Sequence, residues 1–92
     1  MSRSAHNEEV LERVRRSVSE FVAGELDLDG IQVALQSAMP LLERDGTGAD
    51  AVVRAAEADI EEIRFTRLLD EQRPAAVFRL DRFLELLDAA DP

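Results

Sequence analysis

The 92-residue sequence has no cysteine, lysine, tryptophan or tyrosine, and its single histidine is His6. Without cysteine, the chain can form neither a disulfide bond, nor a thiolate metal site, nor a cysteine nucleophile. One histidine is too few for the Glu-x-x-His pairs of a di-iron bundle, and the chain offers no credible Ser–His–Asp arrangement. We therefore predict a protein that is not an enzyme, with no catalytic residue, no cofactor and no bound metal.

Long apolar runs are also missing. No segment approaches the roughly 18–20 apolar residues of a membrane span, and the first ten residues lack the apolar run of a signal peptide. The net charge is −9, from 20 acidic residues against 11 arginines. Because this charge repels phosphate groups, we expect neither a nucleic acid nor a membrane as partner. The missing membrane span and signal peptide lead us to expect a cytoplasmic location. Such a charge usually serves solubility, and a basic protein partner is the alternative reading.

The segment 49–69 is the longest stretch without glycine or proline that keeps a helical apolar rhythm. Residues three and four apart share one face of an α-helix. The stripe expected to face the core consists of Ala49, Val53, Ala56, Ile60 and Ile63. A second stripe, on nearly the opposite side, consists of Ala51, Ala55, Ala58, Phe65 and Leu69. This second stripe is either covered by the segment around Pro74 or contacted by another protein.

Four segments with this periodicity predict an all-α fold, a small antiparallel four-helix bundle with short connections. The expected helices span residues 8–23, 28–44, 49–69 and 74–89. A kink is expected at Pro40, which lacks a backbone N–H donor. Residues 1–7 are expected to be a flexible N-terminus and residues 8–90 a single helical domain. A three-helix core with a loosely docked fourth segment is the alternative, and whether the third helix continues toward Pro74 stays open.

The expected helix ends depend on residues with suitable side chains or backbone freedom. Asn7 and Asp27 can accept hydrogen bonds from the first free N–H groups of the first and second helices. Gly24 can adopt the left-handed conformation that ends the first helix. Thr47 or Asp50 is expected to cap the third helix.

Two acidic patterns resemble known metal sites. The segment Glu25–Gly30 is similar to the start of an EF-hand loop, but position twelve holds Gln36, where a calcium loop needs a bidentate Glu. A simpler interpretation is that Asp27 caps the second helix and Asp29 favours its first turn.

The second pattern consists of acid pairs with helical spacing. Glu9/Glu12 and Glu85/Asp88 resemble the E-x-x-E and E-x-x-D pairs of MazG-type enzymes, which hydrolyse nucleoside triphosphates with magnesium. The pairs lie on the first and last helices, and the chain has no lysine to assist such chemistry. A metal-dependent helical hydrolase is therefore the least favoured of three readings.

The favoured reading is a protein–protein interaction module, an acidic inhibitor or regulator of a basic protein in the manner of immunity proteins and antitoxins. Apolar side chains would anchor the partner, and acidic side chains would steer it. The candidate interface consists of Phe65, Leu69, Phe78, Glu57, Glu61, Asp27 and Asp29. The alternative is a homodimer of structural or regulatory role, formed through the second stripe of the third helix.

Overall fold

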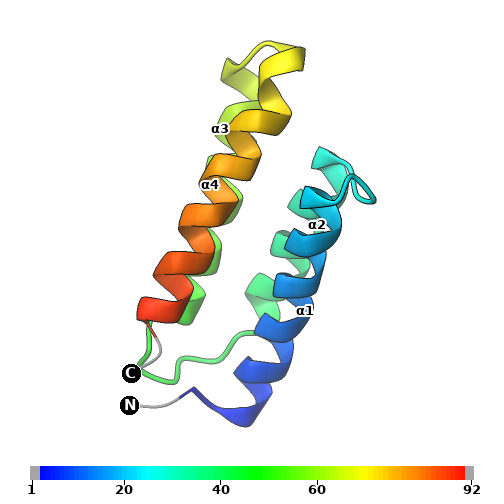
Figure 1. Ribbon diagram of the computed structural model, residues 1–92. Coiled ribbons are helices and arrows are strands. Elements are labelled where there is room, and N and C mark those ends of the chain that lie inside the picture. The colour runs from blue at the N-terminus through cyan, green and yellow to red at the C-terminus, as the bar shows by residue number, and fades with distance from the viewer. Residues whose placement is uncertain (1–2, 91–92) are drawn as a thin grey trace.

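The computed structural model describes residues 3–90, which form four α-helices that run alternately up and down (Figure 1). The elements are α1 (Ala5–Val22), α2 (Leu28–Ala38), a short 3₁₀ turn η1 (Met39–Leu41), α3 (Ala49–Thr66) and α4 (Leu69–Ala89). Close backbone approaches join α1 to α2, α2 to α3 and α3 to α4, whereas α1 and α4 make few. The predicted all-α antiparallel four-helix bundle is confirmed.

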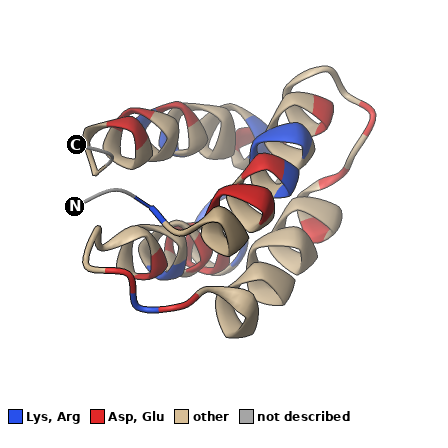
Figure 2. Cartoon of the chain, turned by 90° about the horizontal axis from the view of Figure 1, so that it is seen from below, with Lys and Arg blue, Asp and Glu red and all other residues tan. Residues whose placement is uncertain are grey.

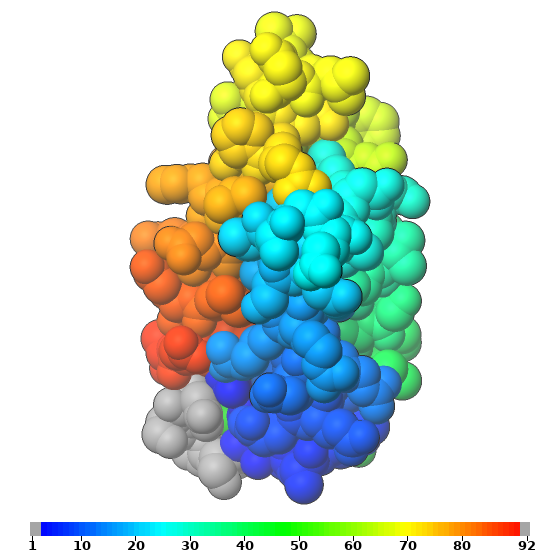
Figure 3. Space-filling model, turned by 45° about the vertical axis from the view of Figure 1, so that its right-hand side comes forward, coloured from blue at the N-terminus to red at the C-terminus, as the bar shows by residue number. Residues whose placement is uncertain are grey.

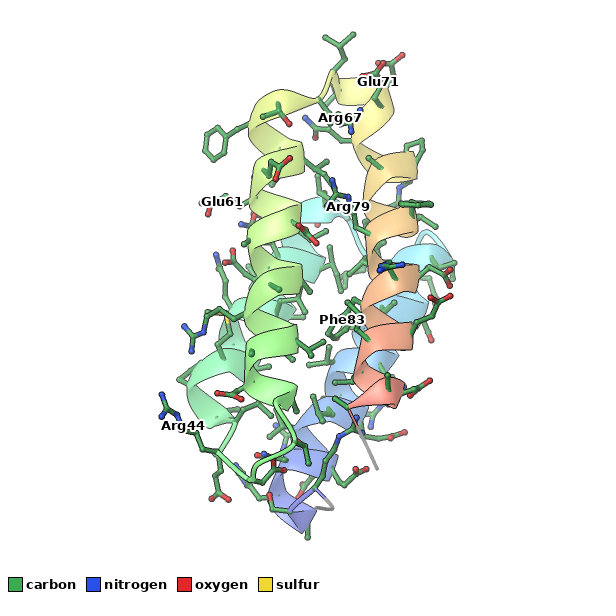
Figure 4. The ribbon with its side chains drawn as sticks, turned by 90° about the vertical axis from the view of Figure 1, so that its left-hand side faces the viewer. Arg44, Glu61, Arg67, Glu71, Arg79 and Phe83 are labelled. Atoms are coloured by element: carbon green, nitrogen blue, oxygen red, sulfur yellow. The ribbon has the colours of Figure 1, made fainter. Side chains whose placement is uncertain are left out.

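The core forms where the helical periodicity turns apolar side chains inward. The predicted core stripe of α3 is buried along its whole length and consists of Ala49, Val53, Ala56, Ile60 and Ile63. Phe21 and Phe83 are buried as well, and Figure 4 shows Phe83 turned from α4 toward the interior. Burying a side chain of this size contributes about 1.5–3 kcal/mol, so the packed faces are the main source of stability.

α1 begins earlier than predicted, because Ser4 and not Asn7 is its N-cap. Ser4 Oγ accepts a hydrogen bond from Asn7 N at 3.1 Å. Asn7 is fully buried and holds the α2–α3 loop, since its Oδ1 accepts from Glu43 N at 2.8 Å and its Nδ2 donates to Glu43 O at 2.7 Å. Residues 5–7, which the sequence placed in a flexible terminus, are therefore the first turn of α1. Residues 1 and 2 of that predicted terminus lie outside the described residues.

The turn between α1 and α2 follows the prediction. Gly24 has a φ of 84°, and Glu25 N donates to Glu20 O at 2.9 Å, which is the backbone pattern of a Schellman motif. Asp27 caps α2 by accepting a hydrogen bond from Gly30 N at 2.7 Å. Local signals were sufficient here because every contact joins residues close in sequence.

The second helix is shorter than the predicted 28–44. α2 ends at Ala38, and Pro40 lies in the 3₁₀ turn that follows. Leu42 is already extended, with a ψ of 132°. The kink expected at Pro40 is therefore a break, because proline withholds one N–H from the α-helical ladder and the chain leaves the helix there.

The start of α3 also differs from the prediction. Gly48, with a φ of 79°, occupies the N-cap position, and no side chain caps the helix there. Thr47 Oγ1 accepts a weak bond from Ala49 N at 3.4 Å, and Asp50 lies within the first turn. The expectation that Thr47 or Asp50 is the N-cap is wrong, because the loop reaches the helix through the left-handed glycine.

The connection between α3 and α4 is tighter than predicted. α3 ends at Thr66 instead of residue 69, and α4 begins at Leu69 instead of residue 74. Pro74 is the sixth residue of α4, in its second turn, where the missing N–H leaves one carbonyl without its helical donor. Two acidic residues in the first turn favour this helix start. From α4, Gln72 Nε2 donates to Arg67 O at 3.2 Å and so covers a carbonyl at the end of α3.

Both ends of the described chain lie at one end of the bundle, and the α3–α4 connection lies at the other (Figure 1). The Arg3 guanidinium donates to the Leu87 carbonyl and joins the N-terminal segment to the last turns of α4. The bundle measures 40 × 22 × 21 Å, and the α3–α4 hairpin extends past the α1–α2 turn (Figure 3). Within residues 3–90, no helix has the length and apolarity needed to cross a membrane.

Candidate partner-binding surfaces

The most exposed large apolar side chains of the described chain all lie on the α3–α4 hairpin. Their exposed fractions are 85% for Leu69, 82% for Phe65, 71% for Phe78 and 69% for Leu68. Single exposed apolar residues are common on protein surfaces, whereas their concentration on one unit marks an interaction surface. The hairpin is therefore the first candidate surface.

We call Phe65, Leu68 and Leu69 the hairpin tip, because they lie at the end of α3, in the connection, and at the start of α4. Phe65 follows the buried Ile63 by two residues, about 200° around the helix, so it points away from the core. Leu68 precedes α4 and Leu69 is its first residue. The helical geometry that buries the core stripe thus exposes the tip.

The remainder of the second stripe of α3 is exposed as well. Ala51, Ala55 and Ala58 all face solvent. The alternative in which the segment around Pro74 covers this stripe is wrong, because α4 packs on α3 through a different face and leaves the stripe open.

The structure does not bring Phe65 and Phe78 into one patch. Phe65 borders a shallow hollow that it shares with Gln32, Glu61 and Arg64 of α2 and α3. Phe78 instead borders a groove between α1 and α4 and a hollow that it shares with Asp70 and Glu71 at the start of α4. The predicted apolar anchors therefore divide into the hairpin tip and a separate surface around Phe78.

Two of the predicted acidic residues are engaged within the bundle. The Glu57 carboxylate accepts hydrogen bonds from Gln32 Nε2 at 3.0 Å and Gln36 Nε2 at 3.3 Å. Asp29 pairs with Arg64 at 3.1 Å, and Arg64 also donates to Gln32 Oε1. These contacts join α2 to α3, so both carboxylates have a structural role that the sequence did not reveal.

The other two predicted acidic residues differ from each other. Asp27 is occupied as the cap of α2. Glu61 is exposed, makes no hydrogen bond or ion pair within residues 3–90, and points away from α4 (Figure 4). Figure 2 shows acidic positions on several helices, so the negative charge surrounds the molecule instead of marking one face.

Sequence reasoning missed a groove between α1 and α4, which we call the α1–α4 groove. It has a volume of about 390 Å³ and is lined by Val18, Val22, Pro74, Val77, Phe78, Asp81 and Leu84. Val22, the last residue of α1, is 56% exposed on the side where α1 and α4 make few backbone approaches. The sequence signal for this groove was the spacing of Val77 and Leu84, which lie seven residues apart and so share one face of α4. In the structure both side chains are half-buried.

Beyond the residues that line this groove, two arginines join α1 and its following turn to α4. Arg73 NH1 donates to Phe21 O at 2.6 Å, and its guanidinium lies 4.2 Å from the centre of the Phe21 ring. Arg73 NH2 also donates to Leu26 O at 2.9 Å. Arg15 pairs with Asp88 at 2.8 Å. On the face shown in Figure 3, α1 and α4 lie side by side.

Asp45 forms the densest polar cluster, at the end of the bundle that carries both chain ends. It accepts hydrogen bonds from Thr47 Oγ1 at 2.6 Å, Thr47 N at 3.1 Å, Ser4 N at 3.1 Å and Asn7 Nδ2 at 3.0 Å. These donors, with the Thr47 hydroxyl first, hold the pKa of Asp45 well below its usual range. All four bonds fasten the α2–α3 loop or the start of α1, which makes the cluster structural.

No group of three or more His, Asp or Glu side chains within residues 3–90 is arranged to hold a metal ion. The pairs Glu9/Glu12 and Glu85/Asp88 therefore do not converge on such a site in the described chain. Comparisons with protein-family models, with curated proteins and with solved structures found no match. The two apolar surfaces and the negative net charge are therefore the features of the molecule that bear on its function.

Proposed function

We propose that the protein is a non-enzymatic protein-binding module that acts in the cytoplasm and docks a basic protein through its α3–α4 hairpin. The observation that carries this proposal is the placement of three of the four most exposed large apolar side chains at the hairpin tip. Burial of each such side chain by a partner would contribute about 1.5–3 kcal/mol. An acidic inhibitor or regulator of the immunity-protein or antitoxin kind is the role that fits best.

Charge and apolar anchors would have separate tasks. The net charge of −9 attracts a basic partner over distances near the Debye length and raises the association rate. Once in contact, the hairpin tip supplies the apolar burial that slows dissociation. Glu61 is the predicted acidic residue best placed to pair with the partner, because no side chain within residues 3–90 occupies its carboxylate.

A matched pair of variants tests this proposal. Phe65→Asp places a charge at the hairpin tip, whereas Val33→Asp places one at a half-exposed position on α2. In affinity capture from cells that contain the protein, we expect a basic partner to be retained by wild type and Val33→Asp. Phe65→Asp should weaken its binding at least about 30-fold, the loss typical of an interface hot spot.

Retention should also fall as salt is raised, because steering between opposite charges is screened. Circular dichroism must show Phe65→Asp to be folded, which we expect because the side chain makes little contact with the core. Equal retention of the same proteins by wild type and both variants, or unfolding of Phe65→Asp, would contradict the proposal.

A homodimer is the second candidate, and the exposed stripe of Ala51, Ala55 and Ala58 is the observation that favours it. Small side chains let two helices approach closely, and Phe65 would close the seam in a two-fold pairing of α3 with its copy. Light scattering across a range of concentrations decides the matter. A dimer that Phe65→Asp dissociates supports this candidate, and a strict monomer excludes it.

A further inference from the structure

We infer that the α1–α4 groove receives a basic amphipathic α-helix of the partner protein. This inference rests on the proposed function, because it names the recognition element of the same partner. The groove runs along α4 from Pro74 to Leu84, ten residues or about 15 Å at 1.5 Å per residue. That length matches roughly three turns of a bound helix, with anchors at positions i, i+3 or i+4, and i+7.

The lining is suited to the apolar face of a helix. Val22 and Phe78 stand exposed on opposite sides of the groove, and Val77 and Leu84 are half-buried between them and the core. A helix placed here would cover all four side chains at once. It would complete the one side of the bundle at which neighbouring helices make few backbone approaches.

The charge of the groove selects the opposite face of that helix. Asp81 is the charged residue in the lining, and Glu85 follows it one turn later on α4. Neither carboxylate forms a hydrogen bond or ion pair within residues 3–90, and both are exposed. Arg15, on the other side, is already paired with Asp88. Unpaired negative charge beside an apolar groove complements a helix that carries arginine or lysine beside its apolar stripe.

The same charges disfavour a second copy of this chain as occupant. A two-fold contact through the groove would place Asp81 and Glu85 against like charges from a molecule that also carries a net charge of −9. The hollow between α1 and α2 is less suitable for a basic helix. Its volume is about 190 Å³, and Arg13 is the charged residue in its lining.

The probe for this inference is a synthetic 14-residue peptide of leucine and arginine, with leucines at helical spacing on one face. A second peptide has the same composition in an order without an apolar face, and a third carries glutamate in place of arginine. Each is titrated into ¹⁵N-labelled protein and followed by two-dimensional NMR. We expect saturable shifts at residues 18–22 and 74–85 with the first peptide, and much weaker effects with the other two.

Three variants locate the binding. Val22→Glu should raise the Kd of the first peptide at least about tenfold, because it places a charge in the apolar groove. Asp81→Lys combined with Glu85→Lys should raise it similarly and should improve binding of the glutamate peptide. Val33→Glu is the matched control, since Val33 is a similarly exposed valine on α2, and it should leave the Kd unchanged.

The inference is overturned if the composition-matched peptide binds as well as the amphipathic one. It is also overturned if the shifts spread over all exposed carboxylates, or if Val22→Glu has no effect. A failed peptide titration with a partner still captured through Phe65 would remove the groove and leave the proposed function standing. Peptide binding in the groove with no partner captured would keep the groove as a helix-binding site and remove the proposed docking of a basic protein through the hairpin.

Discussion

At the scale of single residues, Asp45 has a large influence on one end of the bundle. Thr47 donates two hydrogen bonds to it, and Ser4 and Asn7 donate one each. The carboxylate therefore connects the first turn of α1 to the loop before α3. Its pKa is lowered chiefly by the Thr47 hydroxyl and then by the Thr47 N–H. Burial opposes these two donors, and Ser4 N and Asn7 Nδ2 lower the pKa further.

This lowered pKa predicts a specific dependence of stability on pH. Because the folded-state pKa of Asp45 lies below the unfolded value of about 4, the carboxylate stabilises the fold above that pH. The contribution is lost as pH falls from about 4 toward the folded-state pKa. Urea unfolding should therefore show wild type more stable than Asp45→Asn at about pH 7, with the difference shrinking toward about pH 3.

A second variant checks the cause of this effect. Thr47→Val removes the hydroxyl donor and keeps the backbone donor, so the pH dependence should become smaller without vanishing. A constant difference between wild type and Asp45→Asn from neutral to acid pH would show that the cluster does not lower the pKa of Asp45.

At the scale of elements, α4 contains a proline, Pro74, that does not contribute to the buried face of the helix. Pro74 is exposed and lies in the second turn of the helix. A proline at this place leaves the carbonyl four residues earlier without its helical donor. The helix continues because its core residues from Ala76 onward are buried against the bundle.

Replacing this proline should stabilise the protein. Pro74→Ala restores one N–H donor and a strong helix former, and we expect a gain of about 1 kcal/mol after allowing for the greater freedom of the unfolded chain. Pro40→Ala is the control, because Pro40 lies in a 3₁₀ turn outside the α-helices. Thermal unfolding of both variants decides the point. A lower melting temperature for Pro74→Ala would mean that proline fixes the hairpin more than it weakens the helix.

At the scale of the whole molecule, acidic side chains outnumber basic ones and the excess negative charges repel one another. Twenty acidic residues face eleven arginines, and the described ion pairs are mostly partly exposed and individually weak. Raising sodium chloride from about 0.02 M to about 0.5 M should therefore raise the melting temperature by screening net repulsion.

A variant with fewer charges provides the control for this salt effect. Glu61→Gln and Glu62→Gln together remove two exposed negative charges from α3, so the double variant should melt higher at low salt and respond less to added salt. If melting temperature falls with salt instead, pairs such as Arg79–Asp59 outweigh the repulsion.

Local patterns predicted the architecture because the core stripes depend on spacing alone. Neighbours in sequence are enough to predict the buried stripe from Val53 to Ile63, the N-cap at Asp27 and the end of α1 at Gly24. The start of α1 could not be predicted this way, because Asn7 is fixed by a loop more than thirty residues distant. The start of α4 was misplaced because Pro74 resembles a first-turn proline.

The candidate surfaces were predictable only in part. The exposure of Phe65 and Phe78 followed from their places off the core stripes. The engagement of Glu57 could not be predicted, because it depends on how α2 packs on α3. The exposure of Val22 likewise depends on the distance between the first and last helices, which no single helix encodes.

The placement of the two chain ends has a practical consequence. Both ends of the described chain emerge opposite the hairpin tip (Figure 1). A bead, a fluorophore or a fused domain attached at either end would be held some 40 Å, the length of the bundle, from the tip. The molecule can therefore be immobilised through either chain end with the hairpin tip facing the solution. Labels at the two ends can be exchanged without covering the surface under test.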